Sequence, residues 1–111
     1  MASKYWFAKN PDGRLLAGEA DAVLNAINAG TEVTGDITVT GAAVGDTVLS
    51  VSFNSALEDK CFTTYHVSAA DTVTWVMTNV HASAATANLG TVKAQAIVLP
   101  KAAVDSLIAG M

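Results

Sequence analysis

The chain has 111 residues, of which 51% are hydrophobic and only 14% are charged, and its formal net charge at pH 7 is −4. This length predicts a single domain over residues 1–111, and the shortage of charge predicts that other chains cover part of the surface, as in a homo-oligomer or a docked subunit. The negative charge and the lack of a basic run argue against nucleic-acid binding, and no apolar stretch has the length of a membrane span.

The N-terminal residues 1–14 form a predicted arm or short strand that ends at the turn signal Asn-Pro-Asp-Gly. They contain no continuous apolar segment of the secretory type, so we expect a protein that is cytosolic when it is made. Tyr5, Trp6 and Phe7 lie between two lysines. These rings suit an interface anchor, although one or two of them could instead complete the domain's own core.

Residues 19–29 are predicted to form a helix. Ala20, Val23, Leu24 and Ile27 follow the spacing of one helical face, and Gly30 suits the position after a helix.

From residue 32 to residue 99 the apolar residues recur at every second position, which is typical of half-buried strands. Trp75 lies between Val73 and Met77 in one such run and is predicted to be a core residue. The spacing of the runs predicts an all-β fold, namely a small antiparallel β-sandwich or a jelly-roll-like barrel. The alternating sets are Ile37 and Val39, then Leu49, Val51 and Phe53, then Val73, Trp75 and Met77, with further β-rich runs over residues 60–68 and 91–99.

The tripeptide Asp-Thr-Val occurs twice after a small residue, at Asp46 and at Asp71. Each copy stands where a strand is expected to begin, so each carboxylate is predicted to accept backbone N–H groups of its own turn.

Two segments flank the last expected strand. Residues 79–90 form a long connection, which is either a functional loop or a partly helical excursion. Residues 101–111 follow Pro100 as a predicted helical tail, on which Val104, Leu107 and Ile108 form one apolar stripe that needs a partner surface.

No familiar chemical motif is present. Cys61 and His66 are expected on opposite faces of one strand, which rules against a nucleophile and base pair. The glycines of residues 41–45 match no nucleotide-binding fingerprint, so no cofactor is expected. His66, His81, Asp36, Asp46 and Asp71 lack the spacing of a zinc or calcium site, although a calcium ion between loops of neighbouring subunits stays open.

The stretch from Val33 to Val98 resembles small structural proteins of tailed phages, through the runs AAVGDTVLSV, VSAADTV and TVKAQAIV. The resemblance implies a β-sandwich that decorates or cements the phage head, and it leaves the N-terminal arm, the first helix and the C-terminal tail outside the match.

We therefore expect a non-enzymatic virion protein, made in the host cytoplasm and bound to the major capsid protein on the capsid surface. A homo-oligomer is expected, with a trimer preferred, and residues 4–9 and 101–111 are the expected attachment elements. The alternatives are a receptor- or glycan-binding fibre tip that uses the loop with Asn79, His81 and Asn88, and a small enzyme at a subunit interface.

Overall fold

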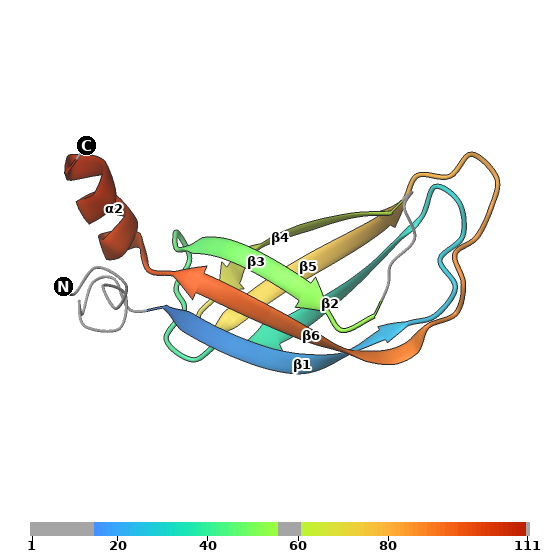
Figure 1. Cartoon of the computed structure of the whole chain (residues 1–111), viewed down its shortest axis with the longest axis horizontal. Coiled ribbons are helices and arrows are strands. Elements are labelled where there is room, and N and C mark those ends of the chain that lie inside the picture. Colours follow the sequence, from blue (N-terminus) through green and yellow to red (C-terminus); the bar gives the residue numbers. More distant parts are fainter. Residues whose placement is uncertain (1–14, 56–60, 111) are drawn as a thin grey trace.

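The computed structural model describes residues 15–55 and 61–110. They contain β-strands and one short helix (Figure 1). The elements are β1 (Leu16–Leu24), β2 (Glu32–Thr38), β3 (Thr47–Phe53), β4 (Cys61–Ala69), β5 (Thr72–Asn79), β6 (Gly90–Leu99) and α2 (Lys101–Ala109).

The strands form two three-stranded antiparallel sheets that pack face to face (Figure 1). Sheet A has the order β1-β6-β3, and sheet B has the order β2-β5-β4. The predicted antiparallel β fold is confirmed, and of the two architectures considered it is sandwich-like rather than a closed barrel. The predicted C-terminal helix is also confirmed, as α2.

The predicted helix over residues 19–29 is wrong. Its first part belongs to β1, which pairs with β6 along all nine of its residues. Its second part leads into a turn at Gly30. Ala22 and Leu24 point inward while Glu19 and Asp21 are exposed, so the segment also fits a period of two. Such a short apolar pattern satisfies both periods, and the ladder with a distant strand decides between them.

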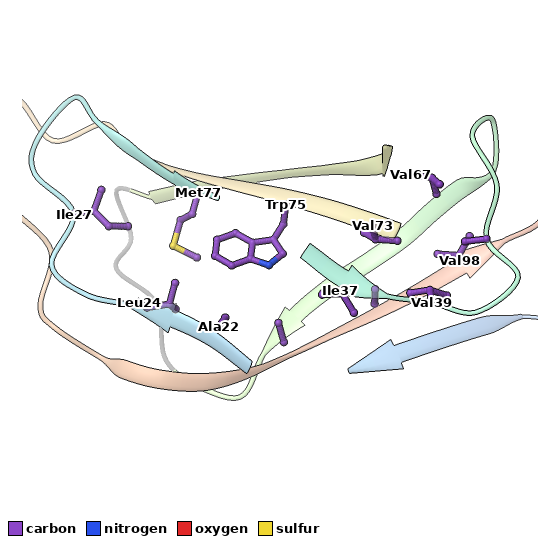
Figure 2. Packing of buried hydrophobic residues seen from close by; sticks show 13 residues of the cluster. Ala22, Leu24, Ile27, Ile37, Val39, Val67, Val73, Trp75, Met77 and Val98 are labelled. Atoms are coloured by element: carbon purple, nitrogen blue, oxygen red, sulfur yellow. The ribbon is translucent and has the colours of Figure 1, made fainter. Parts of the chain in front are cut away.

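Among the residues that the structure describes, Trp75 is the largest buried side chain, and it joins the two sheets. It is 2% exposed, as predicted for a core residue, and its ring meets that of Phe53 from sheet A edge to face, with centroids 5.1 Å apart. Figure 2 shows the indole in the middle of the buried cluster. On β2, Gly35 lies directly opposite Trp75, and an ideal Cβ at Gly35 would lie only 2.5 Å from Trp75 Cζ2. The indole therefore occupies the space that any larger residue at position 35 would need.

Sheet A supplies small residues where sheet B supplies the large ring. Ala94 and Ala96 on the central strand β6 are completely buried. Because interiors pack to high density, small side chains on one layer match a large one on the other.

One inward position was predicted wrongly on β3. Its pairing with β6 shifts between Val48 and Ser50, and the intervening Leu49 is exposed. Val51 and Phe53 do pack against the core, as expected. A bulge adds one residue to a strand and so breaks the alternation that a sequence pattern assumes.

We predict that Gly35→Ala destabilises the fold by roughly 1–3 kcal/mol, because the new methyl group displaces the Trp75 indole. Without that clash, the same change within a strand would stabilise by about 0.5–1 kcal/mol, so the sign of the effect is diagnostic. The measurement is the free energy of unfolding in urea.

Gly110→Ala is the matched control. Gly110 has φ −85°, and a Cβ there would lie 3.5 Å from the nearest atom, the carbonyl oxygen of Ser106. We expect the control to change stability by less than about 0.5 kcal/mol. A Gly35→Ala protein as stable as the parent would contradict the described seat of Trp75.

Candidate functional site

The predicted contact residues of the tail lie on α2. Val104 is half-buried, whereas Leu107 is 44% exposed and Ile108 is 62% exposed. An apolar stripe therefore does face outward on this helix. The other predicted contacts, Tyr5, Trp6 and Phe7, lie outside the described residues.

The helix leaves one end of the sandwich, here called the α2 pole, where β6 ends at Leu99 and β1 begins at Leu16 (Figure 1). Pro100 separates β6 from α2, with φ −58° and ψ 148°, and it cannot donate a ladder hydrogen bond. Within α2 only Ala103 is fully buried, which leaves most of the helix surface open.

Asp46 holds the start of α2. Its Oδ1 accepts the backbone N–H of Lys101 at 2.8 Å, and its Oδ2 accepts that of Ala43 at 2.9 Å. Pro100, at the N-cap position, provides no side-chain cap. The carboxylate therefore supplies the missing acceptor and places a negative charge at the positive end of the helix dipole.

Asp71 performs a related task in the turn between β4 and β5. Its Oδ1 accepts the backbone N–H of Gly41 at 2.8 Å, its own N–H donates to the carbonyl of Ala42, and its carbonyl accepts from Val39. Its φ of +61° is the left-handed conformation that aspartate tolerates better than most residues.

Both Asp-Thr-Val copies thus accept backbone N–H groups at strand starts, as predicted. The expected local partner is confirmed for Asp46, which accepts the N–H of Ala43 three residues away, but Gly41 is 30 residues from Asp71 and Lys101 is 55 from Asp46. Both aspartates bind the connection between β2 and β3, and Asp46 also fixes the exit of α2. Sequence spacing gives no signal for either long-range bond.

The opposite end of the sandwich, here called the loop pole, contains the buried Asn79 at the end of β5. Its Nδ2 donates to the carbonyls of Ile27 and Ala84, both at 2.9 Å, and its Oδ1 accepts the N–H of His81. Thr86 adds a bond from the N–H of Ile27 to its Oγ1 at 2.8 Å. One side chain therefore ties the connection after β5 to the connection after β1.

These contacts define the loop that was considered as a glycan site. Residues 80–89 contain no helix. Asn79 is buried with its amide committed to the backbone, so it cannot reach a sugar at the surface. Asn88 uses its Oδ1 to accept the N–H of Gly90. Of the three polar side chains considered there, His81 is the one whose side chain has no such role.

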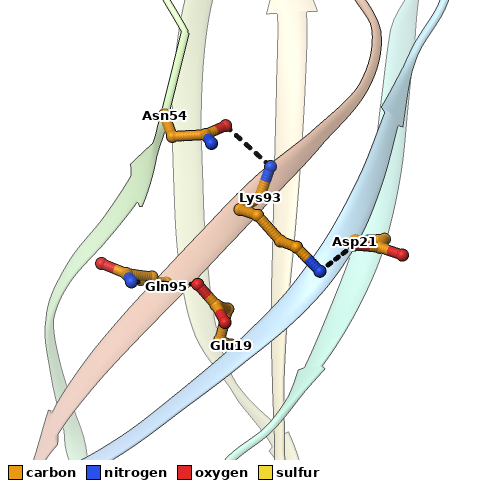
Figure 3. Close-up of polar contacts among 5 residues, drawn as sticks. All are labelled: Glu19, Asp21, Asn54, Lys93 and Gln95. Atoms are coloured by element: carbon orange, nitrogen blue, oxygen red, sulfur yellow. Dashed lines mark hydrogen bonds and ion pairs between the residues drawn. The ribbon is translucent and has the colours of Figure 1, made fainter.

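The outer face of sheet A carries pairs of polar side chains across β1 and β6 (Figure 3). Lys93 Nζ lies 2.5 Å from Asp21 Oδ1, and Gln95 donates to Glu19 at 3.1 Å. The hydrogen bond to Asp21, followed by the attraction of its charge, raises the pKa of Lys93 above its usual value. Asn54, just after β3, accepts the backbone N–H of Lys93. These polar pairs are exposed to solvent, so each contributes little to the free energy of unfolding.

The cysteine and histidines do not form a chemical site among the described residues. On β4, Cys61 packs partly against the core whereas His66 is exposed, as expected for opposite faces. His81 belongs to the loop pole. Within residues 15–55 and 61–110, no group of three or more His, Cys, Asp and Glu side chains could hold a metal ion.

The chain matches no protein-family model, no curated protein sequence and no solved structure. In the part of the chain that the structure describes, no helix has the length and apolar character required to cross a membrane.

We predict that Asp46→Ala lowers the free energy of unfolding by about 1–2 kcal/mol, because it removes the acceptor of two backbone N–H groups. It should also speed hydrogen exchange at the amides of Lys101 and Ala43. The control Asp105→Ala removes only an exposed pair with the Lys101 side chain and should cost less than about 0.5 kcal/mol. Unchanged exchange at Lys101 in the Asp46 variant would refute the capping role.

For the loop pole, Asn79→Ala should cost about 2 kcal/mol or more, since it leaves buried backbone groups without their side-chain partner. Asn88→Ala removes one exposed bond and should cost about 0.5–1 kcal/mol. Thermal or urea unfolding compares the two. Equal losses would show that the buried amide is not what holds the loop.

Proposed function

We propose that the chain is a non-enzymatic virion structural protein, a decoration or cement subunit that binds the major capsid protein on the head of a tailed phage. The resemblance of residues 33–98 to small phage structural proteins supports this proposal. The observed two-sheet β fold agrees with what that resemblance implies. We also propose that the chain forms a homo-oligomer.

One structural observation carries the assignment of contacts. Leu16, the first residue of β1, pairs with Val98, next to the last residue of β6. The chain therefore enters the sandwich at the α2 pole, from which α2 also leaves. Both expected attachment elements, residues 4–9 and residues 101–111, connect to the body at this one end. One end of the body at which β1 begins and α2 leaves is suited to one contact with a shell.

The energetics fit attachment in many copies. Burial of a leucine or isoleucine side chain stabilises a contact by about 1.5–3 kcal/mol, so Leu107 and Ile108 give each copy a modest contribution. Binding to adjacent capsid subunits through several linked copies multiplies that affinity without stronger single contacts. The Asp46 contact would set the angle at which α2 approaches the shell.

We expect the double change Leu107→Ser and Ile108→Ser to weaken binding to purified heads that lack the protein by at least about tenfold, because the apolar stripe no longer buries. The measurement is co-sedimentation with heads over a range of protein concentrations, after circular dichroism has shown that the variants remain folded.

The matched control is Val23→Ser, which removes an exposed apolar side chain from the outer face of sheet A. It should bind heads as the parent does. A second variant with Tyr5, Trp6 and Phe7 changed to alanine tests the other element. Full binding by both the helix variant and the aromatic variant would disprove the assigned contacts.

A further inference from the structure

Strand β4 is an edge of sheet B, because the strand order is β2-β5-β4. Among the described residues no strand pairs along its second side. Every second residue of such a strand turns its N–H and C=O away from the sheet, so β4 presents a row of backbone groups that another strand can pair with.

The other three edges carry features that hinder such pairing. On β1, Asp21 bears a charge and forms an ion pair with Lys93. On β2, Glu32 and Asp36 are charged and exposed. On β3, the bulge after Val48 breaks the regular ladder. Charges and bulges are the usual means by which edge strands avoid pairing with other chains.

β4 carries no charged residue, and its register shift against β5, between Val67 and Ala69, lies near its end. Its sequence, CFTTYHVSA, has no Asp, Glu, Lys, Arg or Pro, and its pairing with β5 is regular from Cys61 to Val67. Phe62 on its outer face is 64% exposed, although it is a large apolar ring. A long, regular and uncharged edge with an exposed aromatic residue is suited to strand addition.

The lack of charge on this edge makes a second copy of the chain compatible as the added strand. The chain carries a net charge of −4, and β4 is an uncharged strip on its surface. A second copy brings the same net charge, and repulsion between like charges is smallest where neither surface carries any. An antiparallel pair of identical strands is also self-complementary, as a two-fold contact requires.

We propose that two copies of the chain pair antiparallel through β4, about a two-fold axis at Thr64, to form one continuous six-stranded sheet. In this register Thr64 lies opposite Thr64 of the partner, and Phe62 lies opposite His66 of the partner. Phe62, Thr64 and His66 all occupy outward positions on β4. Residues directly opposite in a ladder share one face, so the exposed Phe62 ring gains a neighbour on its own face.

This inference does not depend on the proposed function. A two-fold contact gives a dimer in place of the trimer expected above, and the mass of the protein in solution distinguishes the two.

The first test measures the mass of the full chain by analytical ultracentrifugation over a range of concentrations. We expect a species of twice 11.3 kDa. Thr64→Lys places two like charges directly opposite each other and should raise the dissociation constant by roughly tenfold or more. The control Thr91→Lys makes the same change at an exposed position on β6 and should leave the dimer unchanged.

The second test fixes the register and remains decisive if the lysine variant folds poorly. With Cys61 changed to alanine, Thr64→Cys should form a disulfide between two copies under mild oxidation, because opposite residues in an antiparallel ladder lie at disulfide distance. Thr91→Cys in the same background should not. A monomer at all concentrations, an oligomer that Thr64→Lys leaves intact, or a Thr64→Cys protein that does not cross-link would overturn the proposal.

Discussion

The fold depends on the packing of one indole ring, that of Trp75, between the two sheets. Trp75 lies across Gly35, where a Cβ would come within 2.5 Å of the ring, and it meets Phe53 from the opposite sheet. The buried alanines of β6 belong to the same core cluster as this ring. With so few residues, the sandwich has one core, and this ring belongs to the buried cluster that both layers share.

The two ends of the sandwich are held by polar contacts in addition to the apolar side chains, such as Ile27 and Val39, that the connections bury. At the α2 pole, the carboxylates of Asp46 and Asp71 bind backbone N–H groups of one connection, and Asp46 also begins α2. At the loop pole, the buried amide of Asn79 holds two connections together. At each end of the sandwich, short polar side chains form hydrogen bonds with backbone groups that no strand ladder satisfies. The exposed large apolar side chains include Leu107 and Ile108 on α2 and Phe62 on the β4 edge.

The sequence alone predicted what depends on local alternation. Val73, Trp75 and Met77 were placed inward correctly because β5 is regular along its length. Residues 19–29 were misread because a short apolar pattern fits a helix and a strand equally, and only the ladder with β6 separates the two. Leu49 was misplaced because a bulge leaves no trace in the alternation. At the candidate site, the stripe with Leu107 and Ile108 follows from helical spacing, whereas the bond between Asp46 and Lys101 joins residues that only the folded chain brings together.

The central claim is that Trp75 makes the two sheets one cooperative unit, and native-state hydrogen exchange tests it most directly. Amides in the middle of β5 and of β6, the central strands of sheets B and A, should exchange with the same free energy, equal to that of global unfolding. In Phe53→Leu, both sets should lose the same amount of that free energy. If β6 kept its protection while β5 lost it, or if the two strands differed in the parent protein, the sheets would be independent and the claim would fail.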